Sequence, residues 1–179
     1  FSMMEYGKDL LTLIQTRRSI RKFKPDMVPK DIIDKITAAG TYAPTGMNRQ
    51  SAIIIAATNK EVRDRLSKLN AEIMGTDSDP FYGAPVVLIV LANKASATYI
   101  YDGSLVMSNL MLAAHALGIG SCWIHRAKEE FERPEGREIL KLLGIEGEYE
   151  GIGHCILGYA DGDYPKAADR KKDWVYTID

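Results

Sequence analysis

The chain has 179 residues, a length typical of one compact domain. Its formal net charge is −1 and 46% of its residues are hydrophobic, so it has enough apolar material for a core, and no overall field draws it to nucleic acid or to an anionic membrane. The longest apolar run, residues 84–92, is too short to span a bilayer. We expect a cytoplasmic protein without nucleic-acid or membrane partners.

The start of the chain and its cysteines refine this expectation. Residues 1–3 resemble an expression scar followed by a start, so residues 4–179 are expected to form the single domain, and we expect no signal peptide. Cys122 and Cys155 form no CxxC pair and have no zinc-binding spacing with the three histidines. They favour a buried, reduced pair and no metal site.

Apolar spacing and turn residues predict helices mixed irregularly with strands. Helices are expected over residues 10–16, from residue 30 onward, and over residues 60–74, 101–117 and 134–143. Strands are expected over residues 52–57, 86–92, a short stretch ending at 124, and residues 151–158 and 175–178. This order lacks the regular strand–helix–strand alternation of a doubly wound sheet, so the predicted fold class is α+β.

Two of these segments are unusual. The predicted helix 101–117 is apolar almost all round, which is typical of a central helix. The predicted strand 175–178 has no partner nearby in the sequence.

Several nucleotide-binding and hydrolase motifs are absent. The GxG pairs at Gly118–Gly120 and Gly151–Gly153 lack the third glycine of a dinucleotide fingerprint, and the sequence has no P-loop and no GxSxG. Asp161-Gly162-Asp163 lacks the glutamate of a calcium loop and is interpreted as a turn. A nicotinamide substrate would therefore not lie in a Rossmann site.

The first candidate site is the arginine segment, Arg17–Arg21, which contains Arg17, Arg18, Ser19 and Arg21 just after a predicted helix. The planar guanidinium binds a phosphate bidentately, and a serine adds a short donor. By itself, the pattern favours a solvated turn over a phosphate site, because exposed charge runs usually have no specific function.

The second candidate is the 43–50 loop, with the sequence APTGMNRQ, which lies between a predicted helix and a strand. Its hydroxyl and amide side chains suit a planar heterocycle. Its Pro, Gly and Asn residues also suit a turn stabilised by its own side chains, so both interpretations stay open here.

The third candidate follows the predicted helix 101–117, where Gly118 and Gly120 allow close backbone approach and residues 124–126 could direct N–H groups at a ligand. The alternative is a helix C-cap followed by a core strand. A fourth, weaker candidate is the basic tail around Arg170 and Lys171, which also suits a simple solubilising function.

In order, the segments RRSIRKF, APTGMNRQ, FYGAPVVLIVLA, NLMLAAHALGIGSCWIHR and GIGHCILGY, with a late Arg-Lys pair, resemble the short members of the FMN-dependent nitroreductase family. The resemblance implies a central, mainly antiparallel sheet flanked by helices, and a homodimer that exchanges its C-terminal strands. The apolar helix 101–117 would then lie in the dimer core.

The resemblance also implies where FMN binds. The implied cofactor-binding residues are Arg17, Arg18, Ser19 and Arg21 at the phosphate and ribityl chain, Pro44, Thr45, Gly46 and Asn48 reaching the ring from the partner subunit, Ile124, His125 and Arg126 with backbone amides toward flavin N5 and O4, and Arg170 and Lys171 at the phosphate end. Gln50 would contact the ring or only brace the loop. Ser51-Ala52 and Ala168 depart from the family pattern.

The implied activity is hydride transfer from NADH or NADPH to flavin N5, followed by ping-pong reduction of a nitroaromatic, quinone or similar small acceptor, with no catalytic side chain. Three alternatives stay open: a flavin or enoate reductase or reductive dehalogenase on the same scaffold, an FMN storage or sensor protein, and a module that binds a phosphorylated partner through the arginine segment.

Overall fold

The computed structural model describes residues 3–179, with side chains from Asp9 onward, so the expected scar at Phe1 and Ser2 lies outside the described residues. The helices are α1 (Met3–Thr16), α2 (Lys30–Gly40), α3 (Lys60–Met74), α4 (Tyr99–Ala116), α5 (Ala127–Glu132) and α6 (Pro134–Leu142), with a 3-10 turn η1 (Gly46–Asn48). The strands are β1 (Ala52–Ala57), β2 (Val86–Asn93), β3 (Gly120–Ile124) and β4 (Tyr149–Gly158). The expected α+β class is confirmed. The short helix α5 was not predicted.

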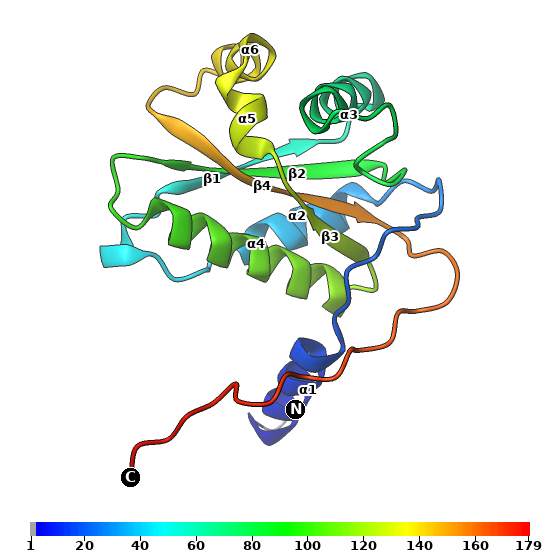
Figure 1. Ribbon diagram of the computed structural model, residues 1–179, viewed down its shortest axis with the longest axis vertical. Coiled ribbons are helices and arrows are strands. Elements are labelled where there is room, and N and C mark those ends of the chain that lie inside the picture. The colour runs from blue at the N-terminus through cyan, green and yellow to red at the C-terminus, as the bar shows by residue number, and fades with distance from the viewer. Residues whose placement is uncertain (1–2) are drawn as a thin grey trace.

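The four strands form one antiparallel sheet in the order β1-β2-β4-β3. Helices α2 and α4 cover one face, and α3, α5 and α6 cover the other (Figure 1). Alternate residues of β2 enter the two cores, with Val86, Leu88 and Val90 on the α4 side and Val87 and Ile89 on the α3 side. The continuous apolar run of β2 is therefore explained by burial on both faces.

Strand β1 lies at one edge of the sheet and pairs only with β2 among the described residues. Its sequence, AIIIAA, carries no charge or proline that would discourage further pairing. A cavity of about 490 Å³ opens beside it, between α2 and the 43–50 loop. This edge has the properties of one that another strand covers.

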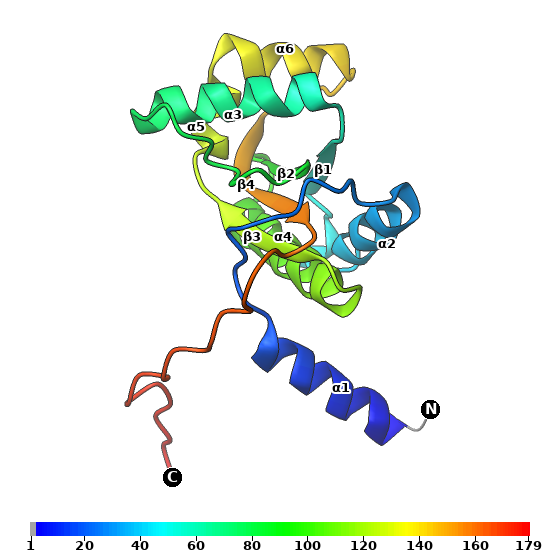
Figure 2. The ribbon, with the colours of Figure 1, turned by 90° about the vertical axis from the view of Figure 1, so that its right-hand side faces the viewer.

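The expected strand at residues 175–178 is wrong for the single chain. This segment has no strand structure, and Ile178 is 99% exposed. A strand needs a neighbour to satisfy its backbone groups, and the tail extends away from the sheet, where the chain offers none (Figure 2). Exchange of this segment between subunits stays a prediction.

Helix α4 packs Val106, Met107 and Leu110 against the sheet. Its opposite side is also apolar, with Tyr101 71% exposed and Leu105 44% exposed. The helix was expected to be central, but in the single chain it is buried on only one of its sides. No described helix is long and apolar enough to cross a bilayer.

Candidate functional site

The arginine segment runs beside β3. The N–H of Ile20 donates to the carbonyl of Ser121 at 2.9 Å, and Ser19 forms a parallel bridge with Ser121. This pairing places Arg17 and Arg18 at a cavity of about 260 Å³ that is also lined by residues 118–121. The segment therefore approaches the glycine pair after α4, as the motif order implied.

A second cavity, of about 190 Å³, lies farther along the same strand and is lined by Arg21 together with Ile124, His125 and Arg126. Arg21 is expected to bind the same cofactor as residues 124–126. The fold brings these residues together although about a hundred positions separate them in the sequence. Both cavities lie along β3, and part of the arginine segment lines each of them.

The two arginines of the first cavity differ in their contacts. Arg18 Nη1 donates to the carbonyls of Gln15 at 2.9 Å and Arg17 at 2.7 Å, at the end of α1. Arg17 Nη1 and Arg18 Nε are buried and have no hydrogen-bond partner among the described residues. Two buried cationic donors without an acceptor are the feature expected of an anion site.

His115 lies in the same cavity, with its Nε2 2.9 Å from Thr16 Oγ1. Burial lowers its pKa, and the neighbouring Arg17 and Arg18 cations lower it further. The guanidiniums of Arg17 and Arg18 give this cavity a positive potential, which is the sign that a phosphate requires.

In the second cavity, the 124–126 turn connects β3 to α5. Arg126 has φ 76°, a left-handed conformation that is uncommon for a residue with a side chain. Behind the turn, His154 Nδ1 lies 3.0 Å from the carbonyl oxygen of Ile124, and Asn70 Nδ2 donates to the carbonyl of His125 at 3.0 Å. Arg126 Nε donates to Asn70 Oδ1 at 2.7 Å.

The 43–50 loop is also strained. Met47, Asn48 and Gln50 have φ values of 53°, 53° and 49°, and such conformations cluster where a loop contacts a ligand or partner. A side chain at Gly46 would collide with Thr98, because a Cβ there would lie 2.2 Å from Thr98 Oγ1.

The loop is anchored by Asp102, which is 2% exposed in the first turn of α4. The carboxylate accepts from Gly46 N–H at 3.0 Å and from Ser51 Oγ at 2.7 Å. Burial opposes ionisation of Asp102, but these hydrogen bonds outweigh it, so its pKa lies below the usual value.

One chain does not bring the 43–50 loop to the arginine segment. The loop contacts Asp102 near the start of α4, whereas Arg17 lies beside His115 near its end. Thirteen residues of helix span about 20 Å at 1.5 Å per residue. The two segments accordingly lie at opposite ends of α4 (Figure 1).

The tail residues lie apart from both cavities. Arg170 donates to the carbonyl of Ala168, at 3.0 Å from Nη2, and Lys171 lies 4.7 Å from the ring centroid of Trp174. All residues from Asp161 onward are exposed. No described contact joins Arg170 or Lys171 to the arginine segment, so their place at the phosphate stays a prediction.

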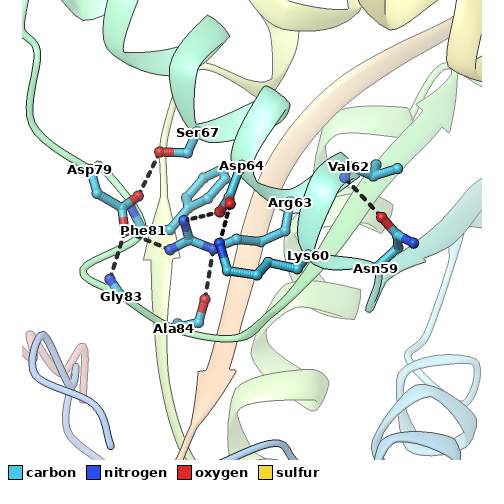
Figure 3. Close-up of polar contacts among 10 residues, drawn as sticks. All are labelled: Asn59, Lys60, Val62, Arg63, Asp64, Ser67, Asp79, Phe81, Gly83 and Ala84. Atoms are coloured by element: carbon cyan, nitrogen blue, oxygen red, sulfur yellow. Dashed lines mark hydrogen bonds and ion pairs between the residues drawn. The ribbon is translucent and has the colours of Figure 1, made fainter. Parts of the chain in front are cut away.

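A carboxylate that sequence reasoning missed shapes the wall of the second cavity. Asp79 accepts from Arg63 Nη2 at 2.5 Å, from Ser67 Oγ at 2.6 Å and from Gly83 N–H at 2.7 Å (Figure 3). This network fixes the loop that carries Tyr82, which lines the cavity beside Arg21. Burial raises the pKa of Asp79, but its hydrogen bonds outweigh burial and lower it.

Comparison with known proteins agrees with this geometry. The sequence profile of the nitroreductase family matches residues 14–78 and 72–159. The chain is 32% identical over 160 residues to a candidate NADH dehydrogenase/NAD(P)H nitroreductase of Methanothermobacter thermautotrophicus, covering 84% of this chain and 77% of the relative.

Solved structures give the same result. A nitroreductase with bound FMN from Bacteroides fragilis superposes with a TM-score of 0.84 at 28% identity, covering 96% of this chain and 99% of that one. A nitroreductase with bound FMN from Desulfitobacterium hafniense gives a TM-score of 0.83 at 26% identity, covering 95% and 98%. The chain belongs to the nitroreductase family.

Proposed function

We propose that the chain is an FMN-dependent NAD(P)H oxidoreductase, with FMN along β3, its phosphate at Arg17 and its ring at the 124–126 turn. The observation that carries this proposal is the buried Nη1 of Arg17 without an acceptor. Leaving such a donor unsatisfied costs about 1–3 kcal/mol or more, and a phosphate oxygen would remove that cost. The relatives solved with FMN support the same assignment.

The residues at the two cavities fit the parts of FMN. Arg17 and Arg18 offer unpartnered donors to a dianion, and Ser19 lies between them and Arg21. At the other cavity, the N–H groups of His125 and Arg126 donate to no acceptor among the described residues. They suit the nitrogen and oxygen edge of a flat heterocycle.

When bound, FMN supplies the two-electron chemistry between NADH or NADPH and a small acceptor such as a nitroaromatic or a quinone. The chain's own groups bind and orient: Arg21 adds positive charge, and the turn donates N–H groups. We propose no side chain as acid or base, because water can deliver protons to an open cavity. One surface serving both substrates implies ping-pong kinetics.

The functional unit is proposed to be a homodimer. Exposed apolar side chains extend over α1 and α4, namely Leu10, Leu11, Ile14, Ile100, Tyr101 and Leu105. A patch of this kind indicates a protein interface. A twofold axis across α4 would pair the two helices antiparallel and bring the 43–50 loop of each chain to the arginine segment of the other.

The tail fits the same arrangement. Trp174, Val175, Tyr176 and Ile178 are 65–99% exposed, and no described strand pairs with the outer edge of β1. If the partner's tail paired with β1 as an added strand, the backbone N–H and C=O groups of both segments would gain hydrogen-bond partners. Arg170 and Lys171 would then move with the exchanged tail.

The test is the absorption spectrum of the purified protein and its uptake of added FMN. We expect flavin bands, and bleaching on anaerobic mixing with NADH or NADPH. A protein that stays colourless after incubation with FMN contradicts the cofactor assignment. A flavoprotein that neither nicotinamide bleaches is a storage or sensor protein rather than an oxidoreductase.

A further inference from the structure

Three buried side chains behind the 124–126 turn have no role in the proposed function. Asn70, Glu130 and His154 are each 0% exposed, and they come from α3, α5 and β4. His154 Nε2 lies against the Glu130 carboxylate, and both side chains are fully buried. Buried polar groups are costly unless paired, so three of them around one short turn suggest a purpose beyond packing.

Each donor in this group contacts a backbone carbonyl of the turn. His154 Nδ1 lies 3.0 Å from the oxygen of Ile124, which can only accept, so Nδ1 carries the hydrogen. Asn70 Nδ2 donates to the oxygen of His125 at 3.0 Å. The carbonyls of two consecutive peptide units are therefore bonded from inside the protein.

The opposite ends of the same two peptide units face the cavity. Residues 3–179 contain no cis peptide bond, and in a trans peptide the C=O and N–H point in opposite directions. The carbonyls of Ile124 and His125 point inward, so the N–H groups of His125 and Arg126 point away from the buried donors, toward the cavity that both residues line.

Hydrogen bonds in such a chain reinforce one another. Donation to the C=O of a peptide polarises the unit and strengthens its N–H as a donor. The effect is larger when the donor is charged. Glu130 contacts the other ring nitrogen of His154, and an imidazolium with both nitrogens protonated would satisfy the carboxylate and the carbonyl together.

We propose that His154, paired with Glu130, and Asn70 are positioning residues that orient and strengthen the N–H donors of His125 and Arg126. This inference rests on the proposed function, in which those donors meet the ring of bound FMN. The negative charge on the ring oxygens of a flavin increases on reduction, so a stronger N–H donor to such an oxygen favours the reduced form, and the buried group raises the reduction potential of the bound cofactor.

The first test needs neither a variant nor flavin. Nitrogen-15 NMR of the flavin-free protein at pH 7 reports the protonation of the His154 ring. We expect both ring nitrogens to carry hydrogen. A neutral ring with one protonated nitrogen overturns the charged pair. This measurement remains informative if the protein takes up no FMN, an outcome that defeats the proposed function instead.

The second test is the reduction potential of bound FMN in Glu130→Gln. Glutamine can donate to Nε2 of a neutral His154, which keeps its Nδ1–H on Ile124, so the charge changes while the hydrogen bonds remain. We expect the equilibrium constant for two-electron reduction to fall about tenfold, which is about 30 mV. An unchanged potential overturns the proposal.

Asn70→Ala is the second variant, and it keeps the test decisive if Glu130→Gln does not fold. We expect a fall in the same direction, about threefold to fivefold, because a neutral amide donor is weaker than an imidazolium. Asn59→Ala is the matched control. It removes the N-cap of the same helix, where Asn59 Oδ1 accepts from Val62 N–H (Figure 3), and should leave the potential unchanged. An equal shift in the control would assign the effect to general loosening of α3 and overturn the proposal.

Discussion

The 124–126 turn and the 43–50 loop both contain left-handed residues, but they are stabilised in different ways. Buried side chains from α3 and β4 bond the turn, so its geometry is complete within one chain. The loop lies beside the outer edge of β1, and its main tertiary anchor is one buried carboxylate, Asp102. We infer that each chain supplies two parts of a site. The 124–126 turn is complete within one chain, whereas the 43–50 loop needs a second chain.

The largest expected effect comes from removing what the second chain supplies. Deleting residues 173–179 removes Trp174, Val175, Tyr176 and Ile178, and burying each such side chain contributes about 1.5–3 kcal/mol. We expect the dissociation constant of the dimer to rise at least a hundredfold and the flavin to be lost. Sedimentation equilibrium with flavin absorbance measures both. A truncated protein that stays dimeric at nanomolar concentration argues against the exchanged tail.

The next largest effect is expected from Arg17→Ala, which changes the part of the site that one chain completes. Removing a charge-assisted bond to phosphate costs about 1.5–3 kcal/mol, so FMN should bind about 10- to 150-fold more weakly. Fluorescence titration with FMN measures the Kd. Arg65→Ala is the control, because Arg65 lies on the exposed side of α3, where it pairs with Glu61. Equal weakening in both variants would refute the phosphate assignment.

Asp102→Asn should destabilise the 43–50 loop and leave the 124–126 turn unchanged. An amide cannot accept as strongly from both Gly46 N–H and Ser51 Oγ, so the loop should lose about 1–2 kcal/mol of local stability. Hydrogen exchange should accelerate at Gly46 about fivefold to thirtyfold. Amides near the 124–126 turn should exchange as in the wild type, and acceleration at both places would show that the regions are not independent.

Acid should also weaken the anchor of the 43–50 loop. Because the pKa of Asp102 is lowered in the folded protein, its stabilising contribution is complete above the unfolded value near pH 3.9 and is lost as pH falls through the lower folded value. Asp79 follows the same sign. Denaturant titrations between pH 6 and pH 3 should show a fall in stability that is smaller in Asp102→Asn.

The smallest expected effect concerns His115. Arg17 and Arg18 help to lower its pKa, so an anion that neutralises them should raise it toward its ordinary value. An NMR titration of the ring with and without FMN measures the change. If the pKa of His115 does not rise on binding, the phosphate does not lie at this cavity.

Much of this arrangement could be predicted from local patterns. The uninterrupted apolar run of β2 indicates burial on both faces, and the family resemblance implied that the arginine segment and residues 124–126 bind one cofactor. The residues that fix the site could not be predicted, because their partners are distant in the sequence. Asn70 is 55 positions from His125, His154 is 30 from Ile124, and Asp102 is 56 from Gly46.

Two errors have physical causes as well. Helix α5 has six residues, too few to show helical periodicity. The tail segment 175–178 has strand composition, but composition does not supply the neighbour that a strand requires.

Subunit complementation tests the shared site most directly. Arg17→Ala impairs one half of a site and Gly46→Ala the other, because a Cβ at Gly46 collides with Thr98. A mixed dimer of the two variants would contain one site with both defects and one intact site. We predict that each variant alone binds FMN weakly and that the purified mixed dimer binds one FMN per dimer with wild-type affinity. If the mixed dimer binds no better than either parent, the two halves belong to the same chain and the account is wrong.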